Sequence, residues 1–385
     1  MKSLMQTLTR TALAAALGAG VAMSAFAADL KVGLSVSLSG PNSSLGVPYA
    51  KGMQAALAYK PEVNGRKIQL IVLDDGSDPT TAGRNARKLV EEDKVDILMG
   101  TSGVPAAIAM AQVGRDAKVP MIGLTPIQLD PAENAWVFTV AQPTQLMIDA
   151  VVQRMKKDGI KTVGYIGFTD AWGDLVYNAL MKSAPEAGIQ VLGNERYARA
   201  DASVTGQVLK LVAMKPDAVM TGGAGTPGAL PFLALTERGF KGPVYGQHGL
   251  INPDFVRVVG ASGQNALMPT GPVIVAEQLP DGYPTKKIAM DFRAAFQKVN
   301  NAPTSDAFSA YSFDGWLVFT DAAARAKGEP GTPEFRLSLR DAIASTKEVV
   351  GTHGVYNFKP GNVYGVDERA RVVVRVDGGT WKYAP

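Results

Sequence analysis

Short apolar stretches alternate along this chain with longer segments whose apolar residues recur at helical spacing. The first unit covers residues 30–61, where an apolar stretch, a polar turn with Gly40 and Pro41, and a helix-like segment follow one another. This order predicts a strand, a loop and a helix, the first half of a βαβ unit. Because ligands of open α/β sheets bind beyond the carboxyl ends of the strands, we expect loop 39–46 to face a binding crevice. Its serine and asparagine residues could hold a small anion at the helix N-terminus, or could only build the turn and cap the helix.

The alternation repeats after this unit and forms two series. In the first series we expect strands at 67–73, 95–99, 119–124 and 136–141 and helices at 80–92 and 106–117. In the second we expect helices at 145–157, 173–187, 204–214 and 228–238 and strands at 162–168, 189–191, 218–221 and 243–246. Repeated βα units form parallel sheets with helices on both faces, so the two series predict an α/β protein with two doubly wound, Rossmann-like lobes.

The last part of the chain breaks this pattern. It has three helical stretches without intervening strands, followed by β-like segments and a hairpin turn: 285–299, 305–326, 333–345, 354–358, 370–376 and 377–379. We expect the helices to complete the first lobe and the final strands to complete the second, with crossings near Val140, Pro272 and Val350. The expected division is 28–141 plus 274–350 for the N-terminal lobe and 142–273 plus 351–385 for the C-terminal lobe. Three crossings would form a hinge beneath a cleft.

The first 27 residues have the pattern of a secretory signal peptide. Lys2 and Arg10 provide the positively charged start, residues 11–25 are small and apolar, and Ala27 ends a small-residue cleavage site. We therefore expect cleavage after Ala27 and a mature protein in the periplasm. No later stretch reaches about 18 uninterrupted apolar residues, so no transmembrane helix is predicted.

Composition narrows the class of function. The chain has no cysteine, which excludes disulfides, thiol catalysis and cysteine-based zinc sites. Lysine and arginine total 39 against 35 aspartates and glutamates, so without Lys2 and Arg10 the mature chain would have a net charge of +2. With no basic block and no interleaving of basic and aromatic residues, nothing indicates nucleic-acid binding. The length suits two domains that rely on hydrophobic cores.

Several short motifs have a functional interpretation that their surroundings do not support. Residues 223–228 match G-x-G-x-x-G after a strand, but no acidic residue follows at the next strand end to hold a ribose, which favours a glycine-rich cleft loop over a dinucleotide site. Ser102 lacks the G-x-S-x-G context of a nucleophile, so it is interpreted as a helix cap or a carboxylate-binding residue. Asp74, Asp75 and Asp78 lie beside glycine and proline, as turn and cap residues do. No cofactor and no metal site is therefore predicted.

The histidines and one tryptophan are further candidates for a site. His248 follows a predicted strand and should face the cleft, with a buried turn histidine as the alternative, whereas His353 lies at the third crossing as a hinge residue. Trp172 begins a helix, where it could stack on a flat or apolar ligand or belong to the core. The aromatic residues of 307–321, including Phe308, are typical of a helix core.

In their order along the chain, seven stretches resemble the branched-chain amino acid (Leu/Ile/Val-binding) group of periplasmic substrate-binding proteins of ABC importers. They are Gly33 to Gly46, Asp74 to Pro79, Gly100 to Pro105, Leu124 to Pro126, Phe138 to Gln142, Gly164 to Gly173 and Gly354 to Pro360. Each stretch is weak alone, but the ordered set spans essentially all of residues 28–385. The resemblance implies the type I periplasmic binding fold, with three linkers between two lobes that close on a ligand. It also implies an inner-membrane permease and its ATPase as partners, and we expect a monomer without enzymatic activity.

The resemblance carries nine ligand-binding positions onto this chain: Leu45, Ser102, Gly103, Thr125, Ile127, Trp172, Ala224, His248 and Phe308. In the family, the loop at 102–103 binds the ligand's carboxylate and the loop at 125–128 gives main-chain contacts. The position of Trp172 holds an aromatic lid, and that of Ala224 often holds a tyrosine. The acid that pairs with an amino-acid ligand's ammonium corresponds to His248.

His248 is a departure from the family pattern with a chemical consequence. A buried ammonium needs an anionic or strongly accepting partner, which a neutral imidazole is not and a protonated imidazole opposes. We therefore expect a small carboxylate without an α-ammonium, foremost an aromatic acid whose flat body would suit Trp172, Phe308 and Leu45. The alternatives are a branched-chain or other amino acid as the ligand, and a sensor in place of a transport component. An exported enzyme is disfavoured, since the sequence offers no nucleophile–base pair and no metal cluster.

Overall fold

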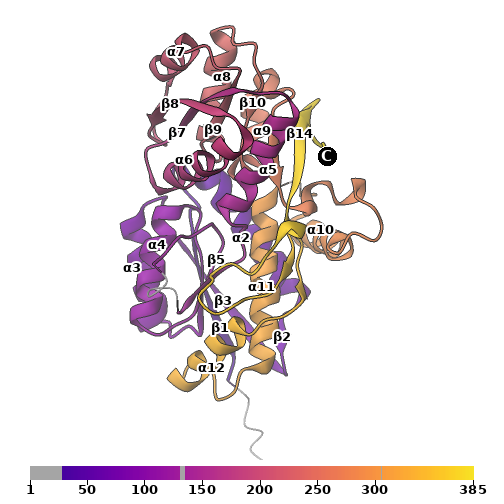
Figure 1. Cartoon of the computed structure of the whole chain (residues 1–385). Coiled ribbons are helices and arrows are strands. Elements are labelled where there is room, and N and C mark those ends of the chain that lie inside the picture. The colour runs from indigo at the N-terminus through magenta and orange to yellow at the C-terminus, as the bar shows by residue number, and fades with distance from the viewer. Residues whose placement is uncertain (1–27, 131–134, 305) are drawn as a thin grey trace, which may run out of the picture.

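The computed structural model describes residues 28–130, 135–304 and 306–385. The predicted signal peptide, residues 1–27, lies outside the described residues. Two lobes, each built on its own β-sheet, lie one above the other, and several segments of the chain pass between them (Figure 1). We call the elements around the six-stranded sheet the first lobe and those around the seven-stranded sheet the second lobe.

The sheet of the first lobe has the strand order β2-β3-β1-β4-β5-β6 and is parallel except for the pair β2–β3. Its strands are β1 (Leu30–Val36), β2 (Glu62–Val63), β3 (Arg66–Asp74), β4 (Ile97–Gly100), β5 (Met121–Gly123) and β6 (Val137–Thr139). In the centre of the sheet, Leu34 aligns with Val72 on one side and with Met99 on the other. β1 and β4 are almost entirely buried because helices cover both faces of the sheet.

The helices of the first lobe come from both ends of the chain. α3 (Pro79–Glu91) and α4 (Val104–Asp116) pack together on one face of the sheet, over a cluster that includes Leu98 and Met110. On the other face lie α2 (Ser43–Tyr59), α10 (Lys286–Asn300) and α11 (Ala307–Arg325), and α12 (Pro333–Ala344) packs against α11. α2 and α11 approach closely because α2 has a glycine at position 52, where a Cβ would lie 2.1 Å from the carbonyl oxygen of Ser309.

The sheet of the second lobe has the order β15-β14-β11-β10-β9-β7-β8, in which β14 and β15 are antiparallel to their neighbours. Its strands are β7 (Thr162–Phe168), β8 (Gln190–Tyr197), β9 (Ala218–Gly222), β10 (Val244–Tyr245), β11 (Leu267–Thr270), β14 (Val372–Asp377) and β15 (Thr380–Tyr383). α5 (Thr144–Lys157) and α6 (Ala171–Ser183) pack on one face, and α7 (Thr205–Ala213), α8 (Leu230–Glu237) and α9 (Pro253–Val259) on the other. The predicted α/β architecture with two doubly wound lobes is confirmed.

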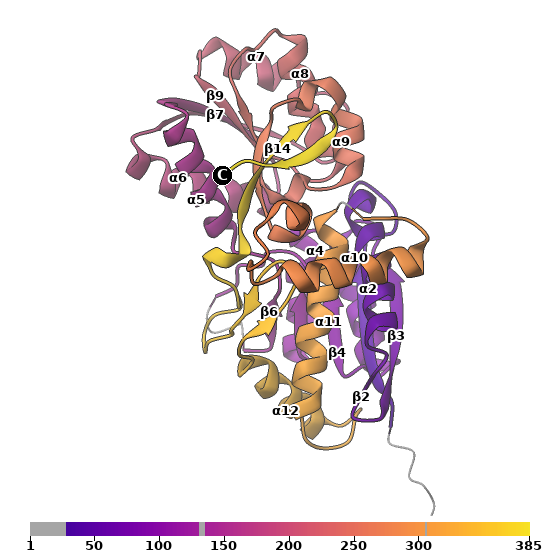
Figure 2. The same cartoon turned by 90° about the vertical axis from the view of Figure 1, so that its right-hand side faces the viewer.

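The chain crosses between the lobes after β6, after β11 and before β14 (Figure 2). The first two crossings meet at His353: Gln142 Nε2 lies 3.4 Å from His353 Nδ1, and a Cβ on Gly271 would lie 1.8 Å from that same nitrogen. The third crossing follows residue 350 by more than ten residues, because β13 (Val355–Tyr356) pairs with β12 (Val349–Val350) and the Thr139 N–H donates to the carbonyl of Val363. Residues 351–363 therefore stay beside the first lobe, whereas the sequence places them in the second.

Candidate functional site

A cavity lies between the lobes, with about 370 Å³ of space not filled by atoms when the adjoining open solvent is included. It is lined by residues from the carboxyl ends of strands and from the helices that follow: Leu45, Tyr49, Ser102, Gly103, Val104, Leu124, Thr125, Pro126, Trp172, Arg199, Ala224, His248, Gly249, Phe308 and Tyr311. Both lobes contribute to this set. A lining that is mostly apolar, with a few convergent polar groups, is typical of a site for a small organic molecule.

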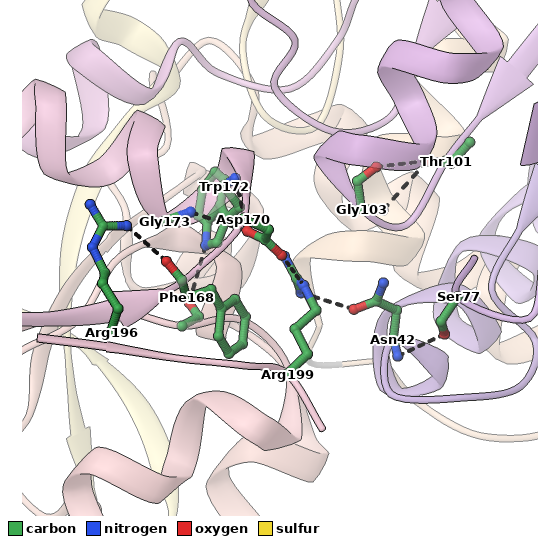
Figure 3. Close-up of polar contacts among 11 residues, drawn as sticks. Asn42, Ser77, Thr101, Gly103, Phe168, Asp170, Trp172, Gly173, Arg196 and Arg199 are labelled. Carbon is green, nitrogen blue, oxygen red and sulfur yellow. Dashed lines mark hydrogen bonds and ion pairs between the residues drawn. The ribbon is translucent and has the colours of Figure 1, made fainter. Parts of the chain in front are cut away.

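The first lobe contributes the loop between β4 and α4. Ser102 Oγ accepts a hydrogen bond from the Ser37 N–H at 2.9 Å, so its own hydroxyl proton remains available to a ligand. Gly103 is the N-cap residue of α4, in an extended conformation, and Thr101 Oγ1 donates to its carbonyl at 3.0 Å (Figure 3). The N-terminus of a helix carries partial positive charge and exposed N–H groups. This end of the cavity therefore suits an anion such as a carboxylate.

Apolar side chains of α2 and α11 form the wall next to this loop. Tyr49 and Phe308 pack edge to face with ring centroids 5.5 Å apart. The Tyr49 hydroxyl donates to the carbonyl of Leu124 at 2.6 Å, and the Tyr311 hydroxyl donates to Gln142 Oε1. Both hydroxyl groups thus already donate to acceptors within the protein, and each residue presents its ring to the cavity.

Trp172 is held by the first turn of α6 in the second lobe. Asp170 caps this helix, and its Oδ1 accepts the N–H groups of Trp172 at 3.0 Å and Gly173 at 3.3 Å. The indole Nε1 donates to the carbonyl of Gly223 at 3.3 Å, so the ring has a fixed orientation. The buried ring packs edge to face on His248, with centroids 5.2 Å apart.

His248 begins the short 3-10 helix η4 (His248–Leu250) and is 3% exposed. Neither ring nitrogen has a hydrogen-bond partner among the described residues. Burial, with a smaller contribution from His353, lowers the pKa of His248 to about 3, so the imidazole is neutral at physiological pH. A neutral imidazole has one donor and one acceptor nitrogen, and a buried polar group without a partner destabilises the protein. A ligand that hydrogen-bonds to this ring would remove that cost.

The structure brings together eight of the nine sequence-predicted site residues around the cavity. Ile127 is the exception: its side chain lies in the hydrophobic cluster below α3 and α4, and its carbonyl accepts a hydrogen bond from the Tyr364 hydroxyl at 2.9 Å. His353, expected at the hinge, stacks on Tyr311 with ring centroids 3.9 Å apart. The role of each residue in binding stays a prediction.

Seven lining residues are not among the predicted ones. Six of them are chain neighbours of predicted residues or lie one helical turn away: Tyr49, Val104, Leu124, Pro126, Gly249 and Tyr311. Helical spacing could have identified two of these, because Leu45 with Tyr49 and Phe308 with Tyr311 are four and three residues apart. Arg199 has no such signal, since it follows β8, a strand that the sequence pattern ends six residues too early.

Direct hydrogen bonds join the two lobes around the cavity. The Thr226 N–H donates to Ser44 Oγ at 3.2 Å, and the Ala307 N–H donates to the carbonyl of Ile251 at 3.0 Å. The first of these contacts depends on glycine at 225, where a Cβ would lie 2.6 Å from Ser44 Oγ. The lobes are therefore closed over the cavity in this structure.

Two doubly wound lobes, three crossings and a cavity lined by both lobes define a two-lobe α/β protein with a candidate ligand site between its lobes. The model of the periplasmic binding protein family matches residues 29–369, and the chain belongs to that family. Among the residues that the structure describes, no helix is long and apolar enough to cross a membrane, and no group of three or more His, Asp or Glu side chains could hold a metal ion.

Solved structures and curated relatives agree with this assignment. Rp1789 of Rhodopseudomonas palustris strain CGA009 is 39% identical with a TM-score of 0.89, over 93% of this chain and 100% of that one. Leu/Ile/Val-binding protein homolog 4 of Brucella melitensis is 24% identical over 394 aligned positions, which cover 96% of this chain and 91% of that protein. A solute-binding protein of an R. palustris ABC transporter, solved in complex with benzoate, is 20% identical with a TM-score of 0.76, over 92% of this chain and 95% of that one, and shares the fold.

Proposed function

We propose that this protein is the periplasmic solute-binding component of an ABC importer and that it binds a small carboxylate, foremost an aromatic acid, in the interlobe cavity. One observation carries the choice of ligand class: no aspartate or glutamate lies among the described residues that line the cavity, and His248 is neutral. An α-ammonium would then be buried without a counter-charge, which costs several kcal/mol. A carboxylate has a suitable place at the N-terminus of α4.

The residues that line the cavity support a flat, apolar ligand body. Trp172, Phe308 and Leu45 offer rings and a branched side chain, and Ala224 leaves room where the family often has tyrosine. Aromatic rings pack well against one another in edge-to-face or offset geometries. We propose that the ligand's carboxylate binds Ser102 and Gly103, that its ring lies near Trp172, and that His248 makes a hydrogen bond at the far end.

The proposed cellular role follows from the family. Binding of the ligand stabilises the closed form, and that form would be recognised by an inner-membrane permease and its ATPase. The protein would act as a monomer, without cofactor and without catalysis, in the periplasm after cleavage at Ala27. The same fold could serve a sensor, and genes for a permease and an ATPase beside this one would favour transport.

A thermal-shift screen tests the ligand class, since a ligand that binds only the folded state raises the melting temperature by mass action. The panel contains benzoate and related aromatic acids, aliphatic acids, and amino acids including leucine and valine. We expect the aromatic acids to give the largest shifts, followed up by calorimetric titration. Tight binding of leucine or valine, with no binding of benzoate-like acids, would overturn the ligand class and leave the binding-protein assignment intact.

A further inference from the structure

Arg199 is the only residue with a permanent charge among the described residues that line the cavity. It belongs to the second lobe, two residues after the end of β8, and its side chain is 15% exposed. A half-buried cation beside a binding cavity is a strong partner for an anion, because the reduced dielectric there strengthens charge interactions.

The guanidinium is fixed in place by its own lobe. Nε donates to Asp170 Oδ2 at 2.5 Å, while the other oxygen of Asp170 caps α6. Cζ lies 4.2 Å from the centroid of the Phe168 ring, so the guanidinium plane is supported from one side. The group is thus oriented before the lobes meet, and little side-chain entropy remains to be lost on binding.

The same guanidinium reaches across the cleft to the first lobe. Nη1 donates to Asn42 Oδ1 at 2.9 Å, and Figure 3 shows Arg199 between Asp170 and Asn42. Asn42 in turn lies against the carboxylate-binding loop, because a Cβ on Gly103 would be 3.0 Å from Asn42 Nδ2. Hydrogen bonds among the described residues use Nε and Nη1 of Arg199 and leave Nη2 for a ligand atom.

We propose that Arg199 determines specificity for a carboxylate: it is the second-lobe partner of the ligand's carboxylate, and its bond to Asn42 holds the lobes closed once the carboxylate is bound. This inference rests on the proposed function for the presence of a carboxylate at Ser102 and Gly103. The carboxylate then bridges both lobes, which makes closure depend on the ligand's negative charge. Asp170 balances the charge of Arg199 in the empty cleft, and the N-terminus of α4 offsets the added anion.

Titration of two ligands into two proteins isolates the charge interaction between Arg199 and the carboxylate. Benzoate and its neutral isostere benzamide are titrated calorimetrically into the wild type and R199M, which keeps a long apolar side chain. We expect R199M to weaken benzoate binding by roughly 10- to 100-fold, as for a lost charge-assisted hydrogen bond, and to change benzamide binding by less than about threefold. R199K should recover part of the affinity for benzoate. Equal losses for the acid and the amide would overturn the proposal, because a merely structural Arg199–Asp170 pair treats both ligands alike.

Two measurements guard against an unrelated cause. R257M removes an exposed arginine of the same lobe, which pairs with Asp254, and should leave benzoate affinity unchanged. The melting temperature of ligand-free R199M shows whether the variant is folded. If R199M is unfolded, the test is made with R199K, which keeps the positive charge but lacks the planar guanidinium group. A loss of affinity for benzoate, without a loss for benzamide, then supports the proposal.

A variant at Asn42 tests the interlobe contact separately from recognition of the carboxylate by Arg199. Its side chain makes no capping bond to α2, so N42A removes the bond across the cleft without uncapping the helix. We expect N42A to speed the dissociation of benzoate several-fold while association changes little, because the bond forms only after the lobes meet. Unchanged dissociation would overturn the role of Asn42.

The proposal and the proposed ligand class fail in different ways. If the wild type binds leucine and not benzoate, the aromatic class is wrong, and leucine and leucinamide are titrated into the wild type and R199M instead. A loss on R199M that is specific to leucine then still supports Arg199 as the partner of the carboxylate. If the wild type binds neither aromatic, aliphatic nor amino acids, both the proposed function and this inference are overturned.

Discussion

His248 contributes a neutral imidazole to the cavity wall, with both ring nitrogens unpartnered among the described residues. If a ligand makes the proposed hydrogen bond there, H248A should weaken benzoate binding by about 1–3 kcal/mol, the range for a buried hydrogen bond. Titration calorimetry of the wild type and H248A measures the difference. An H248N variant keeps a donor and an acceptor and should lose less. Equal affinities of the wild type and H248A would contradict the proposed bond.

Trp172 offers the cavity its ring and not its indole N–H, which already donates to Gly223. W172A should therefore weaken binding by about 1–3 kcal/mol through lost stacking and buried area. W172F keeps an aromatic face and should lose less than W172A. The two variants are compared by titration with the same aromatic acid. A larger loss in W172F than in W172A would contradict packing as the cause.

The two buried histidines also predict how stability depends on pH. Burial lowers the pKa of both His248 and His353 to about 3, whereas the ordinary histidine value is about 6.5, so the unfolded chain binds more protons between these values. The free energy of unfolding therefore falls as the pH drops below about 6.5, by about 1.4 kcal/mol per unit for each histidine. Burial raises the pKa of Asp314 to about 6, which acts in the opposite direction.

A comparison with H248Q isolates one of these groups. Between pH 7 and pH 5, the wild type should lose about 2 kcal/mol more of its free energy of unfolding than H248Q, because His353 and Asp314 titrate alike in both proteins. Denaturant titrations of the ligand-free proteins at the two pH values give this difference. Parallel losses in the two proteins would show that His248 is protonated in the folded state.

At the scale of elements, α2 joins the site to the rest of the first lobe, since it carries two cavity residues and packs on α11. Gly52 permits this packing, so G52A should lower the free energy of unfolding by about 1–3 kcal/mol through overpacking.

Gly206 in α7 is the matched control: nothing lies within 4 Å of a Cβ placed there. G206A should raise stability by about 0.5–1 kcal/mol, because alanine favours the helix. Thermal or chemical denaturation distinguishes the two signs.

The sequence pattern predicts the elements well where apolar periodicity is strong. The predicted helix 333–345 corresponds to α12 (Pro333–Ala344), and the predicted strand 162–168 is β7 (Thr162–Phe168). It fails at β8 (Gln190–Tyr197), which the pattern ends at Val191. This strand lies at the edge of its sheet, and Asn194, Glu195 and Arg196 interrupt the apolar pattern although the backbone still pairs with β7.

The failure at β8 has a direct effect on the candidate site. A strand that ends at Val191 gives no reason to place Arg199 at the cleft, so the sequence pattern missed this permanently charged residue of the lining. The remaining positions came from a resemblance to a family, and eight of these nine line the cavity. Periodicity alone could not assemble them, because they lie at seven separate places along the chain.

At the scale of the whole molecule, the structure shows the lobes in contact across the cavity, through Ser44 with Thr226 and Asn42 with Arg199. If closure depends on the ligand, the ligand-free protein should sample an open form, and the radius of gyration should fall when benzoate is added. Small-angle X-ray scattering with and without saturating benzoate measures this change. At saturating benzoate, the N42A variant should have a larger radius of gyration than the wild type. An identical radius with and without ligand would contradict hinge closure.

The position of β14 in the sheet has a consequence for synthesis of the protein. β14 (Val372–Asp377) lies between β11 and β15, so the second sheet cannot be completed before the residues from Val372 onward have been made. Every residue that lines the cavity is translated before Val372. Until β14 pairs, however, β11 is an open sheet edge, and such edges favour association with other chains. Premature termination between Tyr311 and Val372 should therefore yield an aggregation-prone product, although all of the residues that line the cavity have been made.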